Sequence, residues 1–189
     1  MTSEPQSQFA NSFGEAQEGS ATADYVRALL DLLGDREPLS VVEATPAALE
    51  RAVAGVDDEL LRRPERAGKW SINEVVAHLA DSDLVWGYRL RRVLADERPQ
   101  ITGYDQDQWA DRLRYSEARL ADSLALFAAN RAANLRLVRA ATPEDLQRVG
   151  VHSERGEESA AHMLKLYAAH DLVHLRQIDR IKAAVGAGG

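Results

Sequence analysis

Two histidines four residues apart are the first feature of this sequence that could do chemistry. His170 and His174 lie in a segment with helical spacing of apolar residues, at positions where leucine or isoleucine would be expected. Side chains four residues apart differ by only about 40° around a helix, so two imidazoles can point at one metal ion. Such pairs also recur by accident, as hydrogen-bonded histidines in a core or at its rim. The pair alone therefore leaves both interpretations open.

His78, on another predicted helix, supplies a third imidazole. If that helix faces the last one, three neutral nitrogen ligands could hold one divalent ion and leave coordination positions open, as in catalytic sites. A lone histidine at this place would more often lie at the rim of the core, and spacing does not establish that the two helices are neighbours. Three imidazoles suit Zn, Ni, Fe or Mn, so the identity of the metal stays open.

Two further side chains are weaker candidates for the site. Arg131 lies on the stripe of a third long helix, where its guanidinium could hold a substrate carboxylate. We slightly favour the alternative, in which the side chain extends from the end of the bundle into solvent. Asp105 lies in a loop that could cover the site, where it could orient a ligand histidine, but a solvated carboxylate is the commoner outcome.

The sequence gives the two remaining histidines no firm role in the site. His152 falls in the segment 149–157, which we interpret as a loop, and we expect its side chain to be exposed to solvent. A role in a lid, or behind the metal ligands, is the alternative, because functional groups often lie on loops. His162 lies about 80° from His170 around the helix, so it is left out of the site.

The periodicity of apolar residues predicts the helices that must position these side chains. We expect a short helix at about 22–33, long helices at about 71–95, 107–140 and 158–184, and a short helix from Thr142. A further helix through Val56 begins at Thr45 or as early as Ser40, and a break near Tyr115 is left open. Ser71 and Glu74 have the spacing of a capping box, which marks the start of one long helix.

No segment alternates with period two over the length of a strand, so we predict an all-α fold, a four-helix bundle with an extra short N-terminal helix. Leu164, Leu172 and Leu175 lie away from the main stripe of the last helix. They could pack against the N-terminal helix or against a second subunit, and we favour packing within the chain.

Composition narrows the class of protein further. The 189 residues include no cysteine, which excludes disulfides, a thiolate metal site and a cysteine nucleophile. The net charge of −7 and the mixing of both signs argue against nucleic acid as a partner. No apolar run approaches the roughly 20 residues of a membrane span, and the N-terminus lacks the pattern of a signal peptide. We therefore expect a flexible tail at residues 1–21, one domain at 22–185, and a cytoplasmic protein.

Several short motifs in a fixed order resemble the DinB/YfiT-like superfamily of bacterial metalloenzymes. They are Gly68-Lys-Trp-Ser71, Val76-Ala-His-Leu-Ala-Asp81, Gly103-Tyr-Asp-Gln-Asp-Gln-Trp-Ala110, Gly150-Val-His-Ser-Glu-Arg-Gly-Glu157 and His170-Asp-Leu-Val-His-Leu-Arg-Gln-Ile178. The resemblance covers about residues 23–182. It implies a bundle of up-down-down-up topology, often a homodimer, with a divalent metal ion on His78, His170 and His174.

The better-understood members of that superfamily are thiol-dependent, namely bacillithiol transferases and mycothiol-dependent enzymes. Where relatives often carry Glu, this chain has Asp83, which projects about 140° from His78, so we expect the change to affect a contact at the helix surface.

Three hypotheses for the function follow. The leading one is metal-dependent transfer of a small-molecule thiol to an electrophilic substrate, because a metal on three neutral histidines would lower the pKa of a bound thiol. The second is metal-dependent hydrolysis, for which no general base can be identified from the sequence. The third is a non-catalytic stress protein that binds a metal or a ligand.

Overall fold

The computed structural model describes residues 20–186 of the chain. The predicted tail at residues 1–21 falls outside these residues, apart from Ser20 and Ala21, which begin the first helix. The helices are α1 (Ser20–Leu33), α2 (Pro38–Val53), α3 (Asp58–Arg62), α4 (Ile72–Ala95), α5 (Gln106–Arg112), the 3-10 helix η2 (Tyr115–Glu117), α6 (Leu120–Ala140), α7 (Pro143–Leu146) and α8 (Ala160–Gly186). The strands are β1 (Gln100–Ile101), β2 (Val149–His152) and β3 (Gly156–Ser159).

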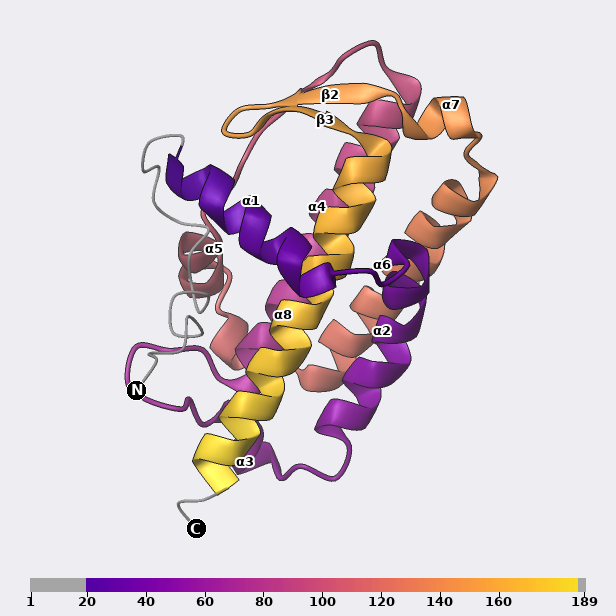
Figure 1. Ribbon diagram of the computed structural model, residues 1–189. Helices are drawn as coiled ribbons and strands as arrows, with labels where there is room; N and C mark the ends of the chain where they lie inside the picture. The colour runs from indigo at the N-terminus through magenta and orange to yellow at the C-terminus, as the bar shows by residue number, and fades with distance from the viewer. Residues whose placement is uncertain (1–19, 187–189) are drawn as a thin grey trace.

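Four long helices form the bundle (Figure 1). Helix α4 packs against α6 and α8, and α2 packs against the same two helices from the other side. Helices α4 and α6 run in one direction and α2 and α8 in the opposite one, so the topology is up-down-down-up. The fold class expected from the sequence is confirmed. Because α4 and α8 are neighbours, His78 can face the histidine pair of the last helix.

The short helix α1 packs against α8. Its Leu29 and Leu33 belong to the same apolar cluster as Leu164, with Leu172 packed against it. Leu164 is therefore buried within the chain and Leu172 is partly buried there, while Leu175 packs, also partly buried, against the other apolar cluster.

The helix starts follow from local chemistry. Ser71 and Glu74 form a capping box at the start of α4, in which the Ser71 amide donates to the Glu74 carboxylate at 2.8 Å. Helix α2 begins earlier than Thr45, because Glu37 caps it and Pro38 occupies its first turn, where a missing amide hydrogen costs nothing. The third long helix of the sequence is divided, as Arg114 adopts a left-handed conformation with φ of 56° between α5 and α6.

A small sheet, with strand order β1-β2-β3, lies over one end of the bundle (Figure 1). Strands β2 and β3 form an antiparallel hairpin, and β1 pairs with β2 in parallel. The expectation of a loop at residues 149–157 was therefore wrong. Gly150 lets this sheet approach the bundle closely, since a Cβ at that position would lie 2.9 Å from Val93 Cγ2 on α4. The hairpin brings residues 152–158 back over the end of α4, which matters for the site.

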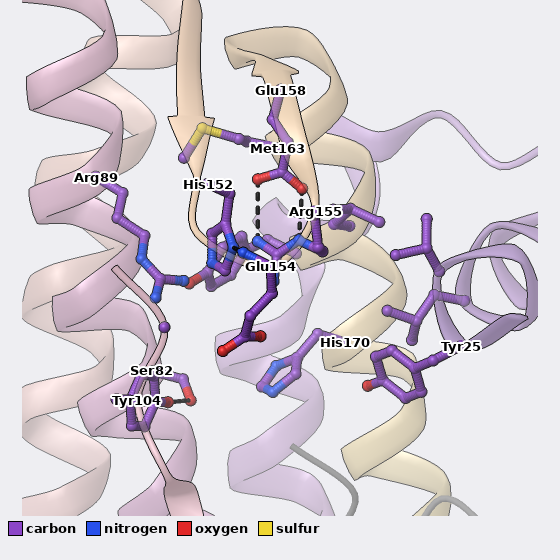
Figure 2. Close-up of a pocket in the computed structure, with 15 residues that line it drawn as sticks. Tyr25, Ser82, Arg89, Tyr104, His152, Glu154, Arg155, Glu158, Met163 and His170 are labelled. Atoms are coloured by element: carbon purple, nitrogen blue, oxygen red, sulfur yellow. Dashed lines mark hydrogen bonds and ion pairs between the residues drawn. The ribbon is translucent and has the colours of Figure 1, made fainter. Parts of the chain in front are cut away.

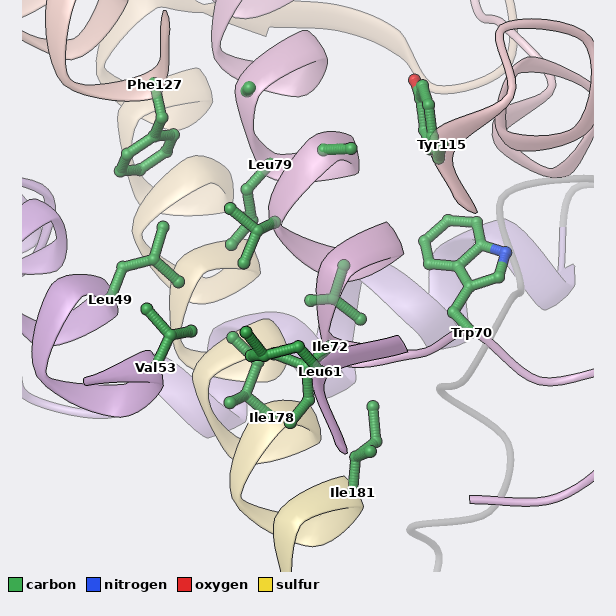
Figure 3. Close-up of a cluster of buried hydrophobic side chains, with 14 of the residues drawn as sticks. Leu49, Val53, Leu61, Trp70, Ile72, Leu79, Tyr115, Phe127, Ile178 and Ile181 are labelled. Atoms are coloured by element: carbon green, nitrogen blue, oxygen red, sulfur yellow. The ribbon is translucent and has the colours of Figure 1, made fainter. Parts of the chain in front are cut away.

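The interior of the bundle has two apolar clusters. One cluster lies around Leu49, Ile72 and Ile178, and the other around Val42, Trp86 and Met163; Figure 3 shows the first. Between them, along each of the four long helices, lies a layer of buried polar side chains. This polar layer comprises Thr45 on α2, Ser82 and Asp83 on α4, Arg131 and Asn134 on α6, and His170, Asp171, His174 and Gln177 on α8.

Candidate metal centre

Three histidine nitrogens meet where α4 and α8 pass each other. The Nε2 atom of His170 lies 3.2 Å from Nε2 of His78 and 3.1 Å from Nε2 of His174. One ligand atom from each ring can be chosen so that all three lie within 4.8 Å of one another. The three side chains are buried. The structure therefore brings together the histidine pair that helical spacing indicated and the third histidine that the family resemblance added.

Burial keeps these imidazoles neutral at neutral pH. Removal from water holds the pKa of His78 and of His170 well below the ordinary value, and the neighbouring imidazoles act in the same direction. Burial also lowers the pKa of His174 to about 4, although the hydrogen bond that His174 donates to Gln177 opposes the shift. A neutral imidazole has one nitrogen with a free lone pair, which is the form that binds a metal.

Gln177 decides which nitrogen of His174 carries the lone pair. Its Oε1 atom accepts a hydrogen bond from His174 Nδ1 at 2.7 Å. Because the proton is on Nδ1, the lone pair of the neutral ring is on Nε2, which faces His170. On the other ligand helix, Ser82 Oγ lies 3.2 Å from His78 Nε2, the ring nitrogen that faces His170, and 2.9 Å from the Tyr104 hydroxyl.

The donor set fits a divalent cation better than a network of hydrogen bonds. His170 Nε2 contacts two other ring nitrogens. This atom carries either one proton or one lone pair, so it cannot make a full hydrogen bond to each of them at the same time. Nitrogens at about 2.0–2.1 Å from a tetrahedral zinc ion lie roughly 3.3 Å apart. The two distances from His170 Nε2 to the other rings, 3.2 and 3.1 Å, are close to this value. A cation among the three lone pairs would replace their mutual repulsion by attraction. The chemistry of the residues present is therefore that of a three-histidine centre.

The centre opens on one side into a pocket (Figure 2). His170 and Ser82 line its inner end, and the cavity volume is about 60 Å³, enough for a small group or a few waters. The walls combine apolar and polar residues, namely Tyr25, Val26, Leu29, Arg89, Gly103, Tyr104, His152, Glu154, Arg155, Glu158, Met163, Leu166 and Tyr167. They come from α1, α4, the segment after β1, the hairpin and α8, so the small sheet closes the outer end.

Arg131 is not part of this pocket. Its guanidinium is buried between two carboxylates, with Nε donating to Asp83 at 2.7 Å and Nη1 donating to Asp171 at 2.6 Å. Thr45 also donates to Asp171, at 2.8 Å. Both expectations for Arg131, a ligand of a substrate carboxylate and a side chain extended into solvent, were wrong. Asp83 likewise makes a buried ion pair with α6 instead of a contact at the helix surface.

Asp105 and His152 also differ from expectation. The Asp105 carboxylate is exposed and accepts from the Gln108 amide at 2.9 Å, so it caps α5, and no hydrogen bond joins it to the three histidines within residues 20–186. This is the commoner outcome that the sequence left open. His152 is buried, not exposed, because it lies on β2 and faces the pocket.

Glu154 is the site residue that sequence reasoning missed. It lies in the turn of the hairpin, and Figure 2 shows its side chain extending into the pocket toward His170. Gly103 leaves room for this carboxylate, since a Cβ there would lie 2.3 Å from Glu154 Oε1. In the sequence, only the family motif at residues 150–157 pointed to Glu154. Its place in the site depends on the turn of a hairpin, which the periodicity of apolar residues does not reveal.

None of the helices within residues 20–186 is both long enough and apolar enough to cross a membrane.

Comparison with known sequences places the chain among proteins described as metal-dependent. The family model of the DinB superfamily matches residues 42–178. A protein of Oceanobacillus iheyensis named "Putative metal-dependent hydrolase" is 32% identical over 145 residues, which cover 77% of this chain and 84% of that protein. YfiT of Bacillus subtilis, named in the same way, is 30% identical over 146 residues, which cover 75% of this chain and 82% of YfiT.

Solved structures agree with the bundle. The structure of YfiT, described as "a probable metal-dependent hydrolase with an unusual four-helix bundle topology", matches with a TM-score of 0.73 and 26% identity, covering 91% of this chain and 92% of YfiT. The crystal structure of TT2238, described as "a four-helix bundle protein", matches with a TM-score of 0.54 and 28% identity, covering 76% of this chain and 96% of that one.

Proposed function

The chain belongs to the DinB superfamily, and we propose that within it this protein is a divalent-metal-dependent hydrolase of small molecules. The observation that carries the proposal is the placement of a carboxylate, Glu154, in the pocket that is lined by His170, one of the three converging imidazoles. The names of the relatives from Oceanobacillus iheyensis and Bacillus subtilis support the same class of reaction. Elemental analysis of the purified protein would identify the metal.

Each side chain of the site has a task in this proposal. His78, His170 and His174 hold the ion, which would supply the Lewis acidity that lowers the pKa of a bound water or thiol. Glu154 accepts the proton that the nucleophile loses, a role that a carboxylate facing the open side of the centre can perform. Burial raises the pKa of the Tyr104 hydroxyl, so this group stays protonated and can donate a hydrogen bond to an oxyanion.

Exchange of Glu154 for glutamine tests the proposal. The Glu154→Gln variant keeps the shape of the side chain but cannot take a proton, so we expect kcat on a panel of small esters and amides to fall by roughly 10²- to 10⁴-fold. The metal content should not change. Glu157→Gln is the matched control, because Glu157 pairs with Arg98 on the outer side of the hairpin. Equal activity of Glu154→Gln and the native protein, for a substrate that the native protein does turn over, would exclude this role.

Transfer of a small-molecule thiol is the second candidate. The chain has no cysteine, so a thiol nucleophile would have to enter the pocket from outside. Its apolar wall, which includes Val26, Leu29, Met163 and Leu166, offers a surface for an electrophilic co-substrate. Conversion of monobromobimane by a thiol such as glutathione, cysteine or mycothiol that is faster with metal-loaded protein than without protein, and not faster with metal-depleted protein, would favour transfer. Hydrolysis without any thiol would favour the leading proposal, and metal binding with neither activity would favour a binding protein.

A further inference from the structure

Arg89 is a buried cation without a carboxylate partner in the described part of the chain. Its side chain extends from α4 into the pocket and is only 8% exposed. Of its five N–H donors, one is used within residues 20–186, as Nη2 donates to the carbonyl of Thr102 at 2.6 Å. The guanidinium also lies 5.9 Å from the centre of the Tyr104 ring. A buried charge is costly unless it is paired, so this position calls for an anion.

The other arginines near the site differ from Arg89 in this respect. Arg131 is held by two aspartates, and Arg155 donates two hydrogen bonds to Glu158, at 2.5 and 3.0 Å. Glu158 is thereby neutralised. The remaining acid in the pocket, Glu154, makes no ion pair with Arg89 and extends toward His170 instead.

His152 offers a second unused donor on the same wall. Its Nδ1 atom accepts a hydrogen bond from the Glu154 amide at 3.2 Å, which assigns the proton of the neutral ring to Nε2. Burial, together with the positive charges of Arg155 and Arg89, lowers the pKa of this imidazole to about 4, so the ring is neutral at neutral pH. The Nε2 atom is buried and has no hydrogen-bond partner among residues 20–186. A buried N–H without an acceptor costs free energy, which an acceptor oxygen from a ligand would recover.

We propose that Arg89 and His152 form a binding site for the carboxylate of a small organic monoanion, beside the three-histidine centre. The planar fork of the guanidinium matches the two oxygens of a carboxylate, and Arg89 has no carboxylate partner within residues 20–186. The apolar wall of Leu29, Met163 and Leu166 would contact the body of the molecule. This inference rests on the proposed function in one respect, namely that another group of the same molecule reacts at the three histidines. The binding of the carboxylate itself does not depend on that reaction.

Binding of phenylacetate, measured by calorimetry or ligand-observed NMR, tests this site. The neutral analogue phenylacetamide serves as the comparison, and both are titrated into metal-loaded and metal-depleted protein. We expect phenylacetate to bind both forms at least tenfold more tightly than phenylacetamide. In Arg89→Met this preference should fall at least tenfold, because a charge-assisted hydrogen bond is lost. Arg92→Met is the control, since Arg92 lies on the same helix but pairs with Asp96 at the surface.

The alternative is that a carboxylate binds the metal ion itself. Phenylacetate binding that requires the metal and is unchanged in Arg89→Met would overturn the proposal. If Arg89→Met does not fold, the Nε2–H resonance of His152 in the native protein gives the answer. A shift of this resonance on addition of phenylacetate to metal-depleted protein supports the site, and an unchanged resonance at saturation overturns it. Arg89-dependent binding in a protein that hydrolyses nothing would contradict the proposed function alone.

Discussion

At the scale of single residues, the proton positions on the imidazoles decide what the centre can bind. Gln177 accepts from Nδ1 of His174, and this contact directs the lone pair of the ring toward His170. Without the amide the proton could move to Nε2, and the ring could also rotate. Groups that orient a ligand histidine in this way commonly contribute about 10- to 100-fold to metal affinity.

We therefore expect Gln177→Leu to bind zinc about 10- to 100-fold more weakly than the native protein while keeping its fold. Competition with a chromophoric chelator measures this affinity, and circular dichroism checks the fold. Gln108→Leu, an exposed position on α5, is the control and should retain the native affinity. Unchanged affinity in Gln177→Leu would show that the amide does not orient the ligand.

His152 gives a prediction for pH. Its pKa is lowered to about 4 in the folded protein by burial, whereas an imidazole in the unfolded chain titrates near 6.5. Between these two values the unfolded state binds more protons, so the folded state loses stability as the pH falls from about 6.5 toward 4. For His152 the loss by pH 4.5 is on the order of 2 kcal/mol.

Urea unfolding of metal-free protein at pH 7 and at pH 4.5 measures this effect. We expect the difference in free energy of unfolding between the two pH values to be smaller in His152→Gln than in the native protein, because one of the buried histidines that titrate on unfolding is gone. The same difference in both proteins would mean that His152 does not titrate on unfolding in this range.

The sequence predicts some of these residues and not others for a physical reason. The angle between His170 and His174 follows from helix geometry, and the resemblance to a known family placed His78 opposite them. Arg89, His152 and Glu154 come together only because a hairpin of two four-residue strands folds back over the bundle. Such strands are too short to show alternation, so the wall of the pocket could not be predicted.

At the scale of elements, the polar layer fixes how the four long helices meet. Arg131 on α6 binds Asp83 on α4 and Asp171 on α8, and it also donates to the carbonyl of Val42 on α2 at 2.8 Å. One side chain therefore connects all four helices of the bundle. Asp171 follows His170 directly, so the ion pair also holds the helix turn that carries a predicted metal ligand.

Removal of this guanidinium should destabilise the bundle strongly. We expect Arg131→Met to lower the free energy of unfolding by roughly 3–5 kcal/mol, since two buried carboxylates lose their counter-charge. Denaturant titration provides the measurement. Arg139→Met on the same helix is the control, because the exposed pair of Arg139 with Glu43 contributes less than about 1 kcal/mol. Similar losses in the two variants would contradict a special role for the buried network.

The sequence pattern identified the long helices well because their caps and stripes are local. The capping box of Ser71 and Glu74 needs no distant partner, and α4 ends at Ala95, as predicted. The role of Arg131 was not predictable. The apolar stripe of the helix shows that this side chain faces inward, but it does not show that two buried aspartates on other helices pair with it. The break at Arg114 likewise depends on a backbone conformation that apolar spacing does not encode.

At the scale of the whole molecule, the fold separates stability from chemistry. Two apolar clusters lie toward the two ends of the bundle, and the polar layer between them contains the buried ion network that joins Arg131 of α6 to α4 and α8. The histidines lie on the side of α4 and α8, where the pocket opens beneath α1 and the hairpin (Figures 1 and 2). The up-down-down-up order makes α4 and α8 neighbours, and it thereby assembles the centre from residues 92 positions apart.

The metal content of the protein tests the central claim most directly. Elemental analysis of native protein, purified without a nickel column, should find about one divalent ion per chain. Chelation should remove this ion, dialysis against zinc or manganese should restore it, and a variant with both His170→Ala and His174→Ala should not take it up. Apo protein that remains folded but binds none of Zn, Ni, Fe or Mn would contradict the account.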